Sequence, residues 1–208
     1  MKIYQFPLSP NCRKVRAVAF ELGLEPELIH LNLFKGEQRA PEILALNPNA
    51  KAPILVDGDF VLWESNAIMA YLAHGSRLLP AALRERADVD RWCAWQLAHM
   101  GPAIGKVAFQ RLVKPMTGQG QPDARVVEEG TAEYTRFAQV LDTSLADKEW
   151  VAGRLSIADF AIASVFSIAE TVGLDSKPYP RLSAWLGRIL KRDSMQRAIG
   201  DSNALAAE

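Results

Sequence analysis

The residues with the clearest potential for chemistry form a short segment near the start of the chain, Ser9-Pro10-Asn11-Cys12. The segment has the spacing of a Cys-x-x-Cys redox motif, but serine stands at its first position. When such a motif opens a helix, backbone N–H groups and the helix dipole favour a thiolate at that first position. A serine hydroxyl cannot attack a disulfide. The segment therefore predicts that Ser9 donates a hydrogen bond to a thiolate carried by a second molecule.

Two neighbouring side chains compete with Ser9 for that thiolate. The amide of Asn11 can also donate a hydrogen bond, and the thiol of Cys12 could form a mixed disulfide. Cys12 occupies the resolving position of the motif, which is usually the more buried one, so we interpret it as structural. The sequence leaves open which of these three side chains contacts the sulfur.

The composition limits the kinds of partner. Lysine plus arginine and aspartate plus glutamate number 24 each, so the formal net charge is zero and nothing indicates a nucleic acid or an anionic membrane. No secretion signal and no membrane-spanning run is apparent. The two cysteines, Cys12 and Cys93, and three histidines show no metal-ligand spacing. We expect a soluble, cytoplasmic protein without a disulfide or a metal.

The first third of the chain alternates strand and helix patterns. Short apolar runs favour strands, and Asp57-Gly58-Asp59 between the last two runs is typical of a hairpin. The expected order of elements is βαβ-α-ββα. The expected strands are 3–6, 28–33, 54–56 and 60–62, and the expected helices are 15–22, 41–46 and a last one from about 65 to 75.

From about residue 83 onward, long helical patterns replace the strands. Gly101-Pro102 should kink or break the first of these helices, because proline lacks an N–H and its ring clashes with the preceding turn. Ser156 and Asp159 have the spacing of a capping box, which we assign to folding rather than to catalysis. The expected helices are 84–112, 124–146, 156–172 and 181–199, with a loop at 113–123 and an interdomain linker at 76–82.

Four segments together resemble the cytosolic glutathione transferase family, and in particular its theta- and delta-like bacterial members with a serine-type site. These segments are 9–15, 47–57, 64–68 and 156–160. The resemblance covers nearly the whole chain. It implies an α+β, thioredoxin-like domain over 1–77 that binds glutathione as a cosubstrate, followed by an all-helical domain over 83–208. It also implies a homodimer with a role in detoxification.

A glutathione site needs groups that match the charges of the tripeptide. Glu64 and Ser65 stand where the last helix of the first domain begins, so the amides and hydroxyl of Ser65 offer an anion site for the γ-glutamyl carboxylate. Glu64 could pair with the amine. The alternative is that Ser65 only caps the helix and Glu64 is a solvated charge.

The resemblance also implies sites for the rest of the tripeptide. It implies a cis bond between Ala52 and Pro53, which turns the backbone of Ala52 toward the cysteinyl backbone of glutathione. Lys51 matches a lysine of theta-like members that holds the glycine carboxylate. Gln38 stands where those members often carry histidine.

The electrophile should bind beside the thiol, against apolar and amphipathic residues around the expected helix kink. The alternative for such residues is that they form the core, as most apolar residues on a long helix do. The candidates are Leu8, His99, Met100, Ile104, Val107 and Phe109.

The predicted function is a glutathione transferase that activates the thiol of bound glutathione for attack on a small hydrophobic electrophile. A second interpretation keeps the site and changes the reaction to peroxide reduction, disulfide reduction or isomerisation. A third is a non-catalytic binding module, as in the gamma subunit of an elongation factor or the stringent starvation proteins. Ser9, Ala52-Pro53 and Glu64-Ser65 favour an enzyme over a module.

Overall fold

The computed structural model describes the backbone of residues 1–205 and the side chains of residues 1–200. The chain divides into two units with separate cores. We call them the sheet unit, Met1–Leu79 with Arg192–Glu208, and the helical unit, Pro80–Lys191. The boundary at residue 79 lies within the expected linker. The expected second domain ran on to residue 208, whereas in the structure the last helix groups with the sheet unit.

The sheet unit is built on four strands in the order β2-β1-β3-β4, with β1 parallel to β2 and the other pairs antiparallel. Gly58, with φ 63°, makes the hairpin between the last two strands. The strands are β1 (Lys2–Gln5), β2 (Glu27–His30), β3 (Ile54–Asp57) and β4 (Phe60–Trp63). The element order βαβ-α-ββα is confirmed.

Strand β2 is shorter than the expected strand 28–33. Asn32 ends it, because its Oδ1 atom accepts hydrogen bonds of 3.1 Å from the N–H groups of both Phe34 and Lys35. Such a side-chain turn competes with strand pairing. The apolar alternation that continues past His30 therefore belongs to a loop.

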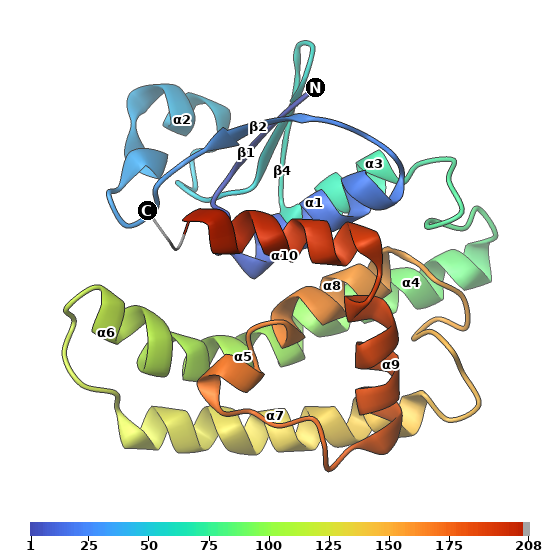
Figure 1. Ribbon diagram of the computed structural model, residues 1–208. Helices are drawn as coiled ribbons and strands as arrows, with labels where there is room; N and C mark the ends of the chain where they lie inside the picture. The colour runs from blue at the N-terminus through green and yellow to red at the C-terminus, as the bar shows by residue number, and fades with distance from the viewer. Residues whose placement is uncertain (206–208) are drawn as a thin grey trace. The chain divides into compact units, whose positions relative to one another are not determined.

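Helices cover both faces of the sheet. Ile43 of α2 packs with Ile54 and Leu31 on one face, whereas Ile3 and Leu55 point to the other, on which α1 and α3 pack against each other (Figure 1). The helices of this unit are α1 (Pro10–Glu21), α2 (Pro41–Leu46), α3 (Ser65–Leu72) and α10 (Asp193–Leu205).

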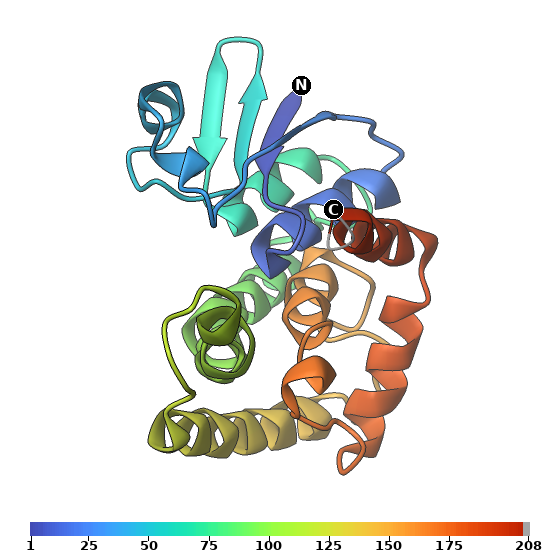
Figure 2. The ribbon, with the colours of Figure 1, turned by 60° about the vertical axis from the view of Figure 1, so that its left-hand side comes forward.

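Helix α10 packs along α1 within the sheet unit (Figure 2). The sequence pattern predicted one helix over 181–199, but the structure ends α9 at Leu190 and begins α10 at Asp193. Arg192 and Ser194 both donate to the carboxylate of Glu21 at the end of α1. No glycine or proline marks this break, so tertiary contacts place it.

The helical unit begins with a nearly continuous helical run, followed by three separate helices. The run consists of α4 (Leu83–Trp95), a π-helical turn (Gln96–Met100), α5 (Gly101–Ala108), a second π-helical turn (Phe109–Val113) and α6 (Lys114–Met116). The later elements are α7 (Ala124–Ser144), α8 (Ile157–Phe166), a 3₁₀ turn (Glu170–Val172) and α9 (Pro180–Leu190).

The helix does not break at Pro102. The π-helical turn before it widens the ring, and the N–H of Gly101 bonds to the carbonyl of Gln96. A side chain at Gly101 would place Cβ 2.7 Å from that carbonyl oxygen. The helix therefore continues into the expected loop at 113–123, and only the part after Met116 is non-helical.

Gly130 of α7 lets α5 pack closely. A Cβ at this position would lie 2.9 Å from Cγ2 of Val107 and 3.1 Å from the carbonyl oxygen of Ala103. We expect Gly130→Val to lower the free energy of unfolding by at least about 2 kcal/mol, because it overpacks two helices. Gly187→Ala is the matched control. Its Cβ would meet nothing within 4 Å, so it should stabilise α9 by up to about 1 kcal/mol. Urea denaturation measures both, and equal effects would contradict the packing argument.

Candidate active site

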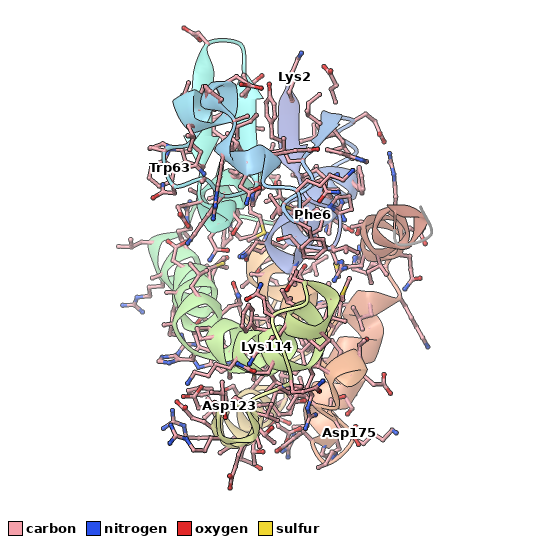
Figure 3. The ribbon with its side chains drawn as sticks, turned by 90° about the vertical axis from the view of Figure 1, so that its left-hand side faces the viewer. Lys2, Phe6, Trp63, Lys114, Asp123 and Asp175 are labelled. Carbon is pink, nitrogen blue, oxygen red and sulfur yellow. The ribbon has the colours of Figure 1, made fainter. Side chains whose placement is uncertain are left out.

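Strand pairing defines one edge of the sheet. Tyr4 pairs with Ile54, and Ile54 pairs with Trp63, so the end of β1, the start of β3 and the end of β4 lie side by side. Figure 3 shows Lys2 at the far end of β1 from Phe6, which leaves the sheet at this edge. The segments that adjoin this edge contain Ser9, Ala52 with Pro53, and Glu64 with Ser65.

Ser9 is the N-cap residue of α1. Its Oγ accepts a hydrogen bond of 3.4 Å from the N–H of Cys12, and its own N–H donates to the carbonyl of Phe6 at 3.0 Å. A side-chain hydrogen bond with Ser9 lowers the pKa of the Cys12 thiol, so the sulfur of Cys12 competes for the proton of the Ser9 hydroxyl. The hydroxyl of this half-buried residue is thus held at a helix start, where it can also donate to a thiolate that binds there.

The two rivals of Ser9 differ in access. Asn11, the second residue of α1, is exposed. Cys12 is fully buried, and its Sγ accepts a hydrogen bond of 3.3 Å from the N–H of Phe6. Burial raises the pKa of the Cys12 thiol, although the hydrogen bonds with Phe6 and Ser9 oppose that rise. Because a buried, protonated thiol is a poor nucleophile, Cys12 is better suited to structure than to a mixed disulfide.

The bond between Ala52 and Pro53 is cis. In the described part of the chain, neither the N–H nor the carbonyl of Ala52 makes a hydrogen bond, so both can pair with an extended peptide. Asn47, which is 2% exposed, steadies this loop by donating from Nδ2 to the carbonyl of Lys51 at 2.8 Å. The sequence analysis assigned Asn47 no role in the site.

Ser65 is the first residue of α3, and Glu64 takes the cap position without a side-chain hydrogen bond. The alternative that Ser65 serves as the N-cap is therefore wrong. Glu64 has φ 72° and ψ 109°, a conformation that non-glycine residues rarely adopt and that costs about 1–3 kcal/mol. Ser65 is 5% exposed, and the first-turn amides of α3 are groups of the kind that can bind an anion.

Lys14 and Arg16 are buried charges that sequence reasoning missed. Both lie on α1 and both are 0% exposed. Nζ of Lys14 donates to Oδ1 of Asn66 at 2.7 Å, which places a positive charge beside the start of α3. A basic run on an amphipathic helix normally indicates a solvated face. Here α3 and α10 pack against α1.

Gln38 and Lys51 lie in different surroundings. The Nε2 of half-buried Gln38 donates to the carbonyl of Leu33 at 3.4 Å, and its buried Oε1 has no partner within the described residues. Lys51 is exposed. The ammonium group of Lys51 and the Oε1 atom of Gln38 could therefore each contact a bound ligand.

The candidates for the electrophile pocket separate into core and surface. Met100, Ile104 and Val107 are at most 1% exposed, so these three pack as core and do not form an open wall. The expectation fails because their helical spacing is the spacing of a buried face. His99 is exposed and its ring lies 5.0 Å from that of Phe137. Leu8 is half-buried and Phe109 is 43% exposed.

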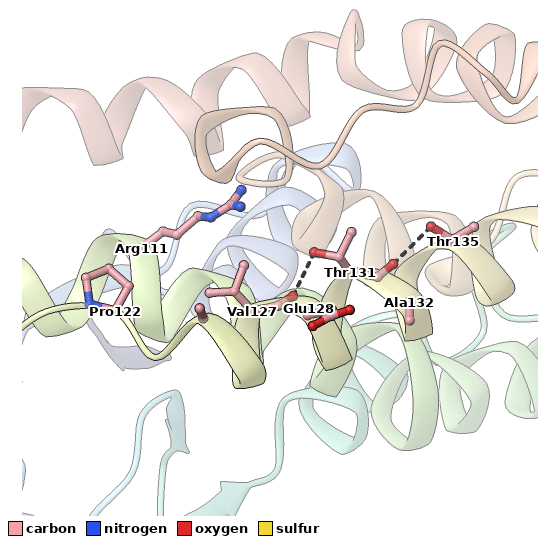
Figure 4. A pocket seen from close by; sticks show the side chains of 8 residues that line it. Arg111, Pro122, Val127, Glu128, Thr131, Ala132 and Thr135 are labelled. Carbon is pink, nitrogen blue, oxygen red and sulfur yellow. Dashed lines mark hydrogen bonds between the residues drawn. The ribbon is translucent and has the colours of Figure 1, made fainter.

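The helical unit contains a cavity of about 760 Å³ that none of these candidates lines. It lies over the first half of α7, and Arg111 reaches across it to donate to the carbonyl of Val172 at 2.6 Å (Figure 4). The hydroxyls of Thr131 and Thr135 bond back to their own helix. Other lining residues are Pro122, Ala124, Val127, Glu128 and Ala132.

The described residues contain neither a helix that could cross a membrane nor a cluster of metal-ligating side chains. None of the helices is long and apolar enough to span a bilayer. Over the same part of the chain, no three histidine, cysteine, aspartate or glutamate side chains are grouped so that they could hold a metal.

A sheet of the order β2-β1-β3-β4, built from a βαβ unit followed by a ββα unit, defines a thioredoxin-like class of protein. Family models for the N-terminal and C-terminal domains of glutathione S-transferase match residues 1–74 and 101–193. The chain therefore belongs to the glutathione S-transferase family.

Relatives from plants and insects are similar over nearly the whole chain. A probable glutathione S-transferase of Oryza sativa subsp. japonica is 35% identical, with 95% of this chain and 94% of that protein covered. Glutathione S-transferase 3 of Zea mays is 35% identical, over 96% and 93%. Glutathione S-transferase D7 of Anopheles gambiae is 34% identical, over 93% and 87%.

Solved structures match equally well. Glutathione transferase F7 of Populus trichocarpa has a TM-score of 0.91 at 27% identity, over 97% of this chain and 99% of that one. Glutathione S-transferase I from maize, in complex with an atrazine glutathione conjugate, has a TM-score of 0.90 at 31% identity, over 97% of each chain. The fold expectation, an α+β thioredoxin-like domain followed by helices, is confirmed.

Proposed function

We propose that this chain transfers the sulfur of glutathione to a small hydrophobic electrophile, and that Ser9 stabilises the attacking thiolate. The observation that carries the proposal is the convergence of three segments at one sheet edge, each with a group of the required kind. These groups are the hydroxyl of Ser9, the unpaired backbone of Ala52 and the helix start at Ser65.

The chemistry requires a thiolate near neutral pH. A free thiol has a pKa near 8.5, so most of it is protonated at pH 7. The hydrogen bond from the Ser9 hydroxyl is stronger to the charged form than to the thiol, so it favours the thiolate, and the start of α1 acts in the same direction. The thiol releases its proton to solvent, the sulfur bonds to the electrophilic carbon and the leaving group departs. Ser9 stays neutral, and no covalent bond to the enzyme forms.

The remaining groups hold the tripeptide in register. The first turn of α3 binds the γ-glutamyl carboxylate, and Glu64 pairs with the amine. Ala52 pairs with the cysteinyl backbone as an added strand would. Lys51 attracts the glycine carboxylate, and the unpartnered Oε1 of Gln38 suits the glycyl N–H.

Named relatives support conjugation over the other reactions. One solved glutathione S-transferase I, 31% identical and with a TM-score of 0.89, is bound with lactoylglutathione, and another carries an atrazine glutathione conjugate. We also propose a cytoplasmic homodimer and a theta- or delta-like bacterial subgroup. The Ser9 motif and the insect relative support the delta-like part of this proposal, whereas the plant relatives are as similar and none of the three relatives described above is bacterial.

The test uses purified protein, a glutathione-affinity column and a panel of four substrates. The panel holds an aryl halide, an α,β-unsaturated carbonyl compound, an organic hydroperoxide and a glutathione mixed disulfide. We expect retention on the column and thioether formation with the first two, with one halide released per aryl thioether. Retention without turnover of any substrate would point to a binding module. Turnover of only the hydroperoxide or the disulfide would replace conjugation by a redox reaction.

A further inference from the structure

Arg16 is, with Lys14, one of two fully buried charged residues on α1. Its guanidinium donates hydrogen bonds to three oxygens of the described residues. Nη1 donates to Oε1 of Gln5, and Nη2 donates to the carbonyls of Pro7 at 3.2 Å and Ala198 at 2.7 Å. Burying a guanidinium is costly, so such a residue needs an explanation.

One of these acceptors, the carbonyl of Pro7, belongs to the turn that positions Ser9. The N–H of Ser9 bonds to the carbonyl of Phe6, and the N–H of Phe6 bonds to Sγ of Cys12. Pro7 lies inside this turn, and the guanidinium of Arg16 holds its carbonyl. The turn is thus fixed at three points, of which Arg16 supplies one.

The third acceptor lies on α10, far along the sequence. The same Nη2 atom that bonds to Pro7 also bonds to the carbonyl of Ala198. Helix α10 is held on α1 by other contacts as well, because Arg197 pairs with the carboxylate of Glu25 at 2.6 Å and lies 3.8 Å over the ring of Phe20. The guanidinium group of Arg16 therefore links the C-terminal helix to the turn that carries Ser9.

We propose that Arg16 is a positioning residue for Ser9. By bridging the carbonyls of Pro7 and Ala198, Arg16 fixes the position of the Ser9 hydroxyl relative to α10. This proposal rests on the proposed role of Ser9. A planar fork can hold two carbonyls in set directions, whereas a lysine ammonium is a point charge that cannot reproduce both angles. Loss of the bridge leaves Ser9 in place but loosens the direction of its hydroxyl, and bound thiolate is then stabilised less.

The test compares Arg16→Lys and Arg16→Met with the control Arg197→Gln. The readout is the thiolate absorbance of bound glutathione as a function of pH, together with kcat and KM for conjugation. We expect both Arg16 variants to raise the apparent pKa of the bound thiol by about one unit and to lower kcat about tenfold below that pKa. The KM for glutathione should change less than about twofold, because no group that binds the tripeptide is removed.

Arg197→Gln weakens the same α10–α1 packing from the other side and leaves the Pro7 carbonyl untouched. Its ion pair with Glu25 is exposed, at 50% and 66%, so little stability should be lost and the thiol titration should stay at the wild-type value. If Arg197→Gln matched the Arg16 variants, general loosening of α10 would explain the result and the bridge would be excluded. A wild-type thiol titration and kcat in Arg16→Lys would also overturn the proposal, since a positive charge without the planar guanidinium would then be enough to position Ser9.

The Ser9→Ala background separates this inference from the proposed function. If Ser9 acts on the sulfur through its hydroxyl, Arg16→Lys should add no further change to the thiol titration of Ser9→Ala. A normal titration in Ser9→Ala would refute the role of Ser9 itself. A shifted titration in Ser9→Ala with wild-type behaviour in both Arg16 variants would refute only the role of Arg16. If Arg16→Met fails to fold, Arg16→Lys alone decides.

Discussion

Ser9→Ala is expected to lower kcat/KM for glutathione conjugation about 100-fold at pH 6.5 and to raise the pKa of the bound thiol by about two units. A hydrogen bond to a charged group contributes about 3 kcal/mol, and one pKa unit corresponds to about 1.4 kcal/mol. Glutathione affinity should change little, because the tripeptide is held elsewhere. Stopped-flow absorbance of the thiolate against pH measures the titration directly.

Two neighbouring variants control for the other candidates. Asn11→Ala removes an exposed amide, and Cys12→Ala removes a thiol that is fully buried. Asn11→Ala should keep the thiol titration within about half a unit of wild type, because the proposal assigns the thiolate to Ser9. Cys12→Ala also removes the acceptor of the Phe6 N–H, so it should shift the titration by no more than the Arg16 variants do. A large shift in Asn11→Ala, with none in Ser9→Ala, would move the role to the amide.

Asp159→Ala is expected to lower the free energy of unfolding by about 4 kcal/mol, because it leaves buried donors without an acceptor. Asp159 is 0% exposed and accepts hydrogen bonds from the N–H of Val151 at 3.0 Å and from Nε1 of Trp185 at 2.9 Å. Its other oxygen accepts from the N–H and hydroxyl of Ser156 at 2.9 and 3.2 Å. The capping box predicted at Ser156 is confirmed.

The comparison for this prediction is Ser156→Ala, which removes only the serine side of the capping box. It should cost about 1 kcal/mol, the usual effect of losing an N-cap. Equilibrium urea denaturation measures both variants. If Asp159→Ala cost no more than Ser156→Ala, the contacts from Val151 and Trp185 would contribute nothing to stability.

The same carboxyl group predicts a pH dependence. Burial is the largest influence and raises the pKa of Asp159 from 3.8 to about 6, while hydrogen bonds from Trp185, Val151 and Ser156 oppose the rise. The folded state thus binds this proton more tightly than the unfolded state. The resulting stability is fully present below pH 4 and is lost as the pH rises through 6.

Asp159→Asn isolates this titration, because asparagine has no proton to release. The stability of wild type minus that of Asp159→Asn should be about 2.4 kcal/mol greater at pH 4 than at pH 7. Urea denaturation at a series of pH values gives the difference. A difference that did not vary between these two pH values would show that the folded carboxyl has an ordinary pKa.

The site was predictable where local sequence decides the geometry. Ser9 with its following helix, and Ser156 with Asp159, involve residues three or four apart, so capping rules suffice. The cis bond at Pro53 was predicted only through the family resemblance, since most bonds of this type are trans. The burial of Met100 and Ile104 in the core could not be predicted, because the same helical spacing is found in a core and in a cavity wall.

The sequence by itself determined that a serine opens the first helix, that a βαβ unit and a hairpin build one sheet, and that helices follow. These features depend on neighbouring residues and on apolar periods of two and 3.6. Only the tertiary structure decided that Arg16 and Lys14 are buried, and that α10 returns to pack on α1. Burial depends on partners far away in the chain, such as Ala198, and no local pattern encodes which distant segment covers a helix face.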